Sequence, residues 1–363
     1  MTSPDAATSS PLRCVLDIHA SLGECPVWSV DEQLLYWVDI NAPSLNRFDP
    51  ATGANIAMPM PESIGSFALR ASGGFVVALR DGFWLASKEG KLTRKVGNAP
   101  YDPAHHRFND GRCDAHGRFF AGSMNEARDA STGALVRLDP DFTQTQVISG
   151  MTISNGLAWS PDGRTMYHAD TPTQVVNAYD YDSATALPTN PRVFMRFTAE
   201  GDRPDGAAVD SEGCYWSALY RGGKVVRIGP DGRLLAAFAV PAMCPTMCAF
   251  GGRDLRTLFV TSARQKRTNE ELERRIAGSE FPRAAVAAGD RAGLRPADEQ
   301  TVVRTRVGSG PQSEDARPEA RHFENVAGGR RELRARGRRA DALQRVEPQK
   351  ARGVERHSSR RYG

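Results

Sequence analysis

The sequence predicts an all-β protein, a six-bladed β-propeller, followed by an irregular Arg-rich C-terminal tail. Three observations support this prediction: one strand–turn–strand unit occurs six times, its period is that of a propeller blade, and the composition changes abruptly near residue 282. The 363-residue chain is 40% hydrophobic and 25% charged, so it has enough apolar material for a large core.

The repeated unit consists of an apolar strand, a tight turn rich in Asp and Gly, and a second, aromatic-rich strand. It covers residues 26–40, 67–84, 112–124, 157–171, 207–220 and 248–263. The turns recur at spacings of about 42, 44, 46, 50 and 39 residues, which is the usual period of a four-stranded blade. Two stacked β-sandwich domains would not explain one unit repeated six times at this period.

Further strands of the blades are expected directly after four of these hairpins, at 44–49, 134–139, 174–180 and 224–228. The predicted organisation is a flexible N-terminus over 1–13, a propeller domain over 14–281 and a disordered basic tail over 282–363. The tail contains 18 Arg and one Lys against 11 acidic residues, and only two aromatic residues. Such a segment cannot bury enough apolar surface to offset its ordering entropy. A short polar helix is expected over 268–276.

Composition also excludes several classes of protein. No apolar run approaches the ~18 residues of a membrane span, and the polar N-terminus lacks the pattern of a secretion signal, so we expect a cytoplasmic protein without membrane partners. Six scattered cysteines do not predict a disulfide framework. The first 281 residues are acidic overall, so no nucleic-acid partner is expected. Serine-hydrolase elbows and Walker A loops are absent.

Polar residues that precede the six hairpins are expected to converge, because loops entering the innermost strands of a propeller meet at one mouth of its channel. Four such places stand out: Glu24, the pair Asn109 and Asp110, Asn155, and Asp205. Carboxylates with amide oxygens form a hard donor set suited to a divalent cation. The alternative is that the Asn-Gly and Asp-Gly pairs only form turns.

The same residues lie in four motifs: GECPVW at 23–28, NDG at 109–111 with FAGSM at 120–124, SNGLAWS at 154–160, and PDG at 204–206. Together and in this order they resemble the signatures of the SMP-30/gluconolactonase family of regucalcin-like sugar lactonases, over residues from about 14 to 272. The resemblance implies a six-bladed propeller, in agreement with the repeat count.

The resemblance also implies roles for individual residues. Glu24, Asn155 and Asp205 match metal ligands, and Asp205 also matches the catalytic acid and base. Arg107, Asn109 and Glu126 match substrate-binding positions. A lactone hydrolase needs a Lewis acid, an activated water and a proton donor for the leaving alkoxide, and this set of residues provides for all three.

The implied activity is hydrolysis of a sugar lactone, such as gluconolactone or a pentonolactone, to the aldonic acid. It implies one divalent cation as cofactor, for which calcium, zinc, magnesium, manganese and iron all remain open, and a small-molecule sugar lactone as partner. Two alternatives are a non-catalytic calcium-binding propeller and a paraoxonase-like esterase or lactonase of other specificity.

The chain departs from the family near its last blade. Residues 276–281 begin the expected closing strand, and the sequence then becomes rich in Arg and Ala. A change of reading frame in the coding DNA near residues 274–282 would explain the break and would leave the sixth blade incomplete. A genuine appended tail is the alternative. A second frame that restores the missing strands would support the first explanation, and the lack of one would contradict it.

Overall fold

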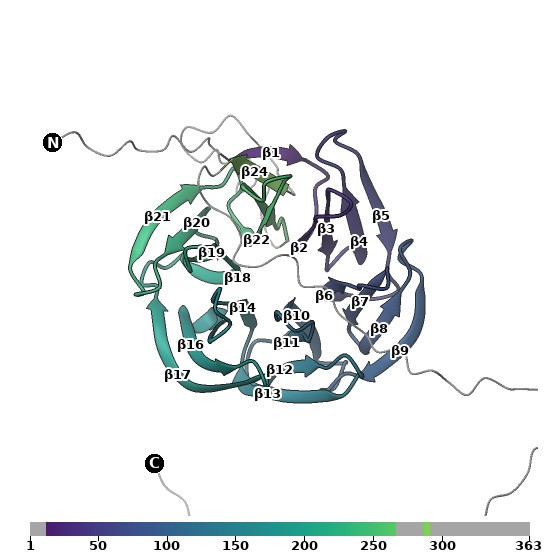
Figure 1. Cartoon of the computed structure of the whole chain (residues 1–363), viewed down its shortest axis with the longest axis horizontal. Helices are drawn as coiled ribbons and strands as arrows, with labels where there is room; N and C mark the ends of the chain where they lie inside the picture. Colours follow the sequence, from purple (N-terminus) through teal and green to yellow (C-terminus); the bar gives the residue numbers. More distant parts are fainter. Residues whose placement is uncertain (1–11, 266–285, 291–363) are drawn as a thin grey trace, which may run out of the picture. The chain divides into compact units, whose positions relative to one another are not determined.

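The computed structural model describes residues 12–265 and the backbone of residues 286–290, and within them it confirms the predicted six-bladed propeller. Six four-stranded antiparallel sheets surround a central axis (Figure 1). The first sheet contains β2 (Gly23–Ser29), β3 (Leu34–Asp39), β4 (Ser44–Phe48) and β5 (Asn55–Pro59), and the second contains β6 (Ile64–Leu69), β7 (Phe75–Leu79), β8 (Gly82–Ala86) and β9 (Leu92–Asn98).

The next three sheets repeat this order, with each strand paired to its successor in the chain. The third contains β10 (His106–Cys113), β11 (Phe119–Asn125), β12 (Gly133–Leu138) and β13 (Gln144–Met151). The fourth contains β14 (Ser154–Trp159), β15 (Thr165–Asp170), β16 (Val175–Asp182) and β17 (Leu187–Arg196), with the 3-10 turn η1 (Thr171–Thr173) after β15. The fifth contains β18 (Arg203–Val209), β19 (Tyr215–Tyr220), β20 (Lys224–Ile228) and β21 (Leu234–Ala239).

The sixth sheet joins the two ends of the propeller. Its order is β22 (Pro245–Gly251), β23 (Thr257–Ser262), β24 (Val286–Asp290) and β1 (Arg13–Leu16), so an N-terminal strand forms the outer edge of the last blade. Strand β24 lies beyond residue 281, where the sequence predicted the propeller to end, and β1 begins at the last residue of the predicted flexible N-terminus. The predicted helix at 268–276 lies outside the described residues.

Apolar side chains fill the spaces between neighbouring sheets, because both faces of each sheet contact another sheet. In the described residues there are six buried clusters: five join two adjacent sheets, and the sixth joins the first and second sheets and also includes Met247 of the last sheet. One example is Tyr36 of the first sheet, whose ring packs edge-on against the ring of Phe75 in the second sheet, with 5.3 Å between the ring centroids. No described helix has the length and apolar character needed to cross a membrane. The packed sheets hold the six innermost strands, β2, β6, β10, β14, β18 and β22, around the axis (Figure 1).

Leu16 tests the closure of the ring by β1. Its side chain is buried in the cluster of Trp28, Leu35 and Phe259 between the sixth and first sheets. We expect Leu16→Ala to reduce the free energy of unfolding by about 2–4 kcal/mol, since it removes buried methyl groups and leaves a cavity. Ile18→Ala, at a position that is 42% exposed, should change it by less than about 0.5 kcal/mol. Urea denaturation followed by fluorescence measures both values, and equal effects would contradict the role of β1.

Candidate functional site

A register shift interrupts the first strand of every blade at nearly the same height. Each shift adds unpaired residues to the innermost strand, which bends the strand and redirects its side chains. The shifts fall between Glu24 and Val27 in β2, Ile64 and Ser66 in β6, Phe108 and Gly111 in β10, Asn155 and Ala158 in β14, Pro204 and Ala207 in β18, and Pro245 and Met247 in β22.

These irregularities correct one sequence-based expectation. Glu24, Asn109, Asn155 and Asp205 were expected in loops that enter the innermost strands, but all four lie inside those strands, next to or within the shifted region. Strand pairs before and after each shift therefore hold their backbone against the second strand of the sheet. The pairs with glycine are consequently not simple turns.

Glycine is needed after the site residues for two different reasons. Gly156 has φ +65°, a conformation that L side chains rarely adopt, and Tyr215 donates a hydrogen bond of 2.8 Å to its carbonyl oxygen. Gly206 has no such φ, but a Cβ there would lie 2.3 Å from Cγ of Met247. A backbone conformation that favours glycine is thus present at Gly156, whereas close packing explains Gly206.

The strand irregularities bring five of the predicted residues around one cavity of about 260 Å³. Glu24, Arg107, Asn109, Asn155 and Asp205 all line it. Each of the five is less than 9% exposed as a residue, although they come from four different sheets. This volume is below the roughly 300 Å³ at which pockets for drug-sized ligands begin, so the cavity suits a small ligand.

A chain of hydrogen bonds fixes the polar side chains of the cavity. Arg107 Nη1 donates to Asn109 Oδ1 at 2.8 Å, and Asn109 Nδ2 donates to Asn155 Oδ1 at 3.0 Å. Asn155 Nδ2 in turn donates to Thr171 Oγ1 at 2.8 Å, and the Thr171 hydroxyl donates to the carbonyl oxygen of Pro204 at 2.7 Å. The amide orientation of Asn155 is therefore defined, with its oxygen on the Asn109 side.

Three carboxylates lie buried close together at this site: Glu24, Asp110 and Asp205. Burial raises the pKa of Glu24 well above its usual value, and the negative charges of Asp205 and Asp110 raise it further. Burial and the charge of Asp110 likewise raise the pKa of Asp205. Asp110 accepts a hydrogen bond from the Leu157 N–H at 3.1 Å, and its pKa is raised by burial. The fold thus concentrates negative charge where little water is available to stabilise it.

The donor atoms of the site fit a divalent cation. Asp205 Oδ1 and Asp110 Oδ1 are buried without a hydrogen-bond partner among the described residues, and a buried unpaired carboxylate oxygen is costly unless a cation or proton compensates it. No group of three His, Cys, Asp or Glu side chains in the described part of the chain is arranged to hold a metal by itself. The predicted set differs from such a group because an amide oxygen of Asn155 supplements the two carboxylates.

Glu126 does not line the cavity, although it lies next to Arg107. Its carboxylate accepts hydrogen bonds of 2.7 and 3.1 Å from Arg80, and it lies 3.8 Å from Arg107 Nε. The hydrogen bonds from Arg80 lower the pKa of Glu126. Direct contact of Glu126 with substrate stays a prediction, and the contacts that it makes here support Arg107 from outside the cavity.

Three further cavity residues, Thr171, Arg128 and Arg203, were missed by sequence reasoning. Thr171 follows strand β15 and orients Asn155, a role that only the packing of η1 beside β18 reveals. Arg128 is in the loop after β11, and Arg203 is the first residue of β18. The only available signal for Arg203 was its position directly before the PDG motif.

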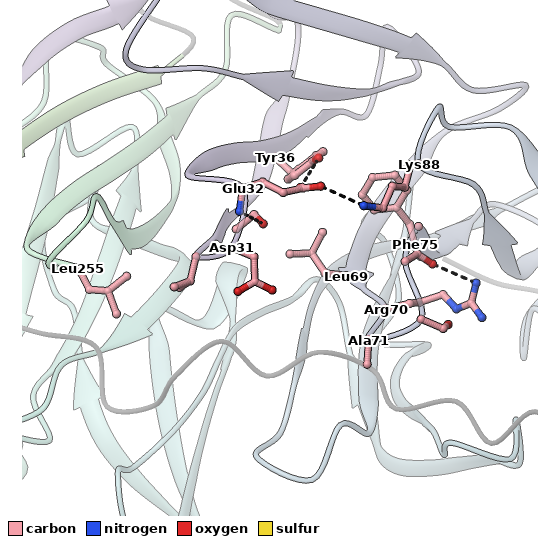
Figure 2. Close-up of a pocket in the computed structure, with 14 residues that line it drawn as sticks. Asp31, Glu32, Tyr36, Leu69, Arg70, Ala71, Phe75, Lys88 and Leu255 are labelled. Carbon is pink, nitrogen blue, oxygen red and sulfur yellow. Dashed lines mark hydrogen bonds and ion pairs between the residues drawn. The ribbon is translucent and has the colours of Figure 1, made fainter.

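A larger cavity of about 620 Å³ lies among hairpin turns at the other ends of the innermost strands (Figure 2). It contains no predicted site residue. Its polar groups contact each other: Tyr36 donates to Glu32 at 2.7 Å, Lys88 lies 3.4 Å from Glu32, and Arg70 donates to the Gly73 carbonyl at 3.3 Å. Volume alone therefore does not identify the functional site.

Comparison with known proteins agrees with this arrangement. The SMP-30/Gluconolactonase/LRE-like region model matches residues 22–264. A 6-deoxy-6-sulfogluconolactonase of Pseudomonas putida is 48% identical over 263 residues, which are 72% of this chain and 90% of that protein. Regucalcin of Xenopus laevis is 37% identical over 262 residues, 70% of this chain and 88% of that protein.

Solved structures give the same result. The crystal structure of a calcium-binding protein, regucalcin, from Agrobacterium tumefaciens has a TM-score of 0.74 and 25% identity, and the match covers 82% of this chain and 98% of that chain. The resemblance inferred from the four motifs is confirmed: the chain belongs to the SMP-30/gluconolactonase/LRE-like family.

Proposed function

We propose that the protein hydrolyses a sugar lactone to the corresponding aldonic acid, with a divalent cation as cofactor. The observation that carries this proposal is the cavity in which the buried carboxylates of Glu24 and Asp205 lie beside the buried guanidinium of Arg107. One oxygen of Asp205 has no hydrogen-bond partner in the described part of the chain. Relatives with lactonase names support the reaction class, and the name of the Pseudomonas putida relative supports a six-carbon sugar lactone.

Glu24, Asn155 and Asp205 would hold the cation. When bound, it supplies Lewis-acid polarisation of the lactone carbonyl. Hard oxygen donors of this kind accept calcium, magnesium, manganese, iron or zinc, because such sites select ions mainly by their geometry. The calcium-binding regucalcin structure makes calcium the first cation to test.

Asp205 serves as the acid and base in this mechanism. Its carboxylate takes a proton from the water that adds to the carbonyl carbon, and it returns that proton to the ring oxygen as the C–O bond breaks. The ring oxygen thus leaves as a neutral hydroxyl and the carbonyl carbon becomes a carboxylic acid. Burial and the negative charge of Asp110 raise the pKa of Asp205 above its usual value, as is common for groups in active sites.

Arg107 and Asn109 bind and orient the substrate. Arg107 uses Nη1 to donate to the Phe108 carbonyl and to Asn109 at 2.8 Å each, which leaves Nη2 without a hydrogen bond among the described residues. An N–H group at this place can donate to an oxygen that gains negative charge in the transition state. Burial lowers the pKa of Arg107 to about 10, so the guanidinium remains protonated at neutral pH.

A proton-release assay of the full chain tests this function, since each hydrolysed lactone forms an acid. Freshly prepared gluconolactone and pentonolactones should be hydrolysed faster than in buffer alone, and simple aryl esters should not. Faster hydrolysis of aryl esters than of sugar lactones would instead favour an esterase of paraoxonase type. We further propose that the protein acts in the cytoplasm.

Thr171→Val should weaken cation binding by about 10- to 100-fold, because the substitution removes the hydroxyl that orients Asn155 while it preserves the volume of the side chain. Thr171→Ser keeps the hydroxyl and is the matched control, with an expected change of less than about 3-fold. Titration calorimetry with calcium and with manganese measures both affinities. Equal affinities of the two variants would contradict the orienting role.

A further inference from the structure

Two guanidinium groups of the cavity wall form no close ion pair with another described residue. Arg128 and Arg203 both line the cavity, and within the described residues neither forms an ion pair or a side-chain hydrogen bond. Arg128 is exposed and Arg203 is partly buried. They belong to the third and fifth sheets, which flank the fourth sheet in the ring (Figure 1). The two arginines therefore reach the cavity from different blades.

The acidic side chains nearest to these arginines in the sequence are occupied elsewhere. Glu126, two residues before Arg128, is bound by Arg80, and Asp129 accepts a hydrogen bond of 2.7 Å from Asn125 Nδ2. Asp202, beside Arg203, lies 2.9 Å from Lys224 Nζ. None of these three carboxylates therefore pairs with either guanidinium. The carboxylate that acts on Arg128 is that of Asp205 in the cavity, one of the residues that would hold the cation.

The loop that carries Arg128 is held in place. The backbone N–H of Arg128 donates to the Asn125 carbonyl at 3.1 Å, and the Asn125 side chain accepts a hydrogen bond of 2.9 Å from the Ala127 N–H. Arg128 itself adopts a positive φ of 61°. Such a backbone fixes the point from which the guanidinium extends, as expected for a residue that binds a ligand.

We propose that Arg128 and Arg203 bind a tetrahedral oxyanion, a sulfonate or phosphate, on the end of the sugar lactone that is remote from the lactone carbonyl. This inference rests on the proposed function, and it assigns the substrate class and the residues that select it. A divalent cation and the guanidinium of Arg107 match the charges of Glu24, Asp110 and Asp205, so Arg128 and Arg203 are left as positive charges on the cavity wall. Binding a neutral sugar would desolvate them without compensation, whereas an oxyanion provides charge-assisted hydrogen bonds.

The test compares gluconolactone with its 6-phosphate and its 6-deoxy-6-sulfonate, using the full chain in the proton-release assay. We expect kcat/KM for at least one anionic lactone to exceed that for gluconolactone by about 10- to 100-fold. The phosphate and sulfonate arms show which oxyanion is preferred. Equal or faster hydrolysis of the neutral lactone would overturn the proposal without any variant.

Variants then locate the selectivity. Arg128→Ala and Arg203→Ala should each reduce the ratio of anionic to neutral kcat/KM by about 10-fold, mainly through KM for the anionic lactone. Lysine at either position should restore part of the ratio, since it keeps the charge but not the fork of donors. Arg196→Ala is the matched control, because Arg196 is an exposed arginine of β17 that does not line the cavity. A ratio that is the same in all variants would contradict the assignment.

Equilibrium binding separates this inference from the proposed function. Calorimetry with glucose 6-phosphate and 6-deoxy-6-sulfoglucose, against glucose, measures recognition of the oxyanion without any reaction. Binding of these anions that depends on Arg128 and Arg203, with no lactone hydrolysed, would support the oxyanion site and contradict the lactonase. Hydrolysis of lactones with no preference for the anion would support the lactonase and contradict the oxyanion site.

Discussion

Asp205→Asn is expected to reduce kcat for lactone hydrolysis by about 10²- to 10⁴-fold, the contribution typical of a positioned acid and base. The substitution keeps the size of the side chain and one oxygen atom, but asparagine cannot accept and return a proton. It also removes one of two carboxylates that would hold the cation, so assays should use saturating cation. The measurement is initial-rate proton release with gluconolactone.

Two controls make the result specific to Asp205. Asp231→Asn changes an exposed aspartate in the turn between β20 and β21, and it should leave kcat within about 2-fold of the original value. Circular dichroism of Asp205→Asn should match that of the original protein, because the side chain packs in the same volume. Residual activity above about a tenth of the original would assign the acid and base role to another residue.

Removal of the cation should destabilise the protein, and more strongly at pH 8 than at pH 5.5. Burial raises the pKa values of Glu24 and Asp205 in the folded state, whereas in the unfolded chain they lie near about 4. Below about pH 4 the carboxyl groups are protonated in both the folded and the unfolded state, so they do not change the free energy of unfolding. As pH rises toward the folded-state pKa values, ionisation increasingly favours unfolding unless a cation compensates the charge.

Thermal denaturation after chelation measures this effect. A cation at about 100 times its dissociation constant stabilises the fold by about 2.7 kcal/mol, or about 5–10 °C for a domain of this size. Glu24→Gln removes one buried charge, so the chelated variant should melt at a higher temperature than the chelated original at pH 8, and added cation should raise it less. A melting temperature that is independent of chelator at both pH values would show that no cation compensates these carboxylates.

The periodicity of the sequence predicted most of the propeller because each blade repeats the same physical problem. Every hairpin needs a tight turn and two strands with a buried side, and the turns near Asp31, Gly163 and Gly213 show this directly. The closing strands were harder to predict. β1 pairs with β24 across more than 260 residues of chain, and the short run Val286–Asp290 consists of small residues without the alternation that marks a strand.

The candidate site was predicted as a set of residue types, but its geometry was not. Five of the six predicted residues line one cavity, whereas Glu126 contacts Arg80 beside it. The irregularities of the innermost strands could not be inferred, because a bulge depends on pairing between strands and not on local propensity. Thr171 was missed because its role depends on contacts with Asn155 and Pro204, and Arg128 was missed because only the fold places its loop at the cavity.

The most direct test of the lactonase proposal is the cation dependence of turnover in the full chain. The protein would be treated with chelator, desalted, and assayed with gluconolactone and its 6-substituted forms after addition of calcium, magnesium, manganese, zinc or ferrous iron singly. The proposal predicts a rate equal to spontaneous hydrolysis without cation, and recovery of catalysis with at least one of them. A folded, cation-saturated protein that hydrolyses none of these lactones would contradict the proposal and leave a propeller that only binds the ion.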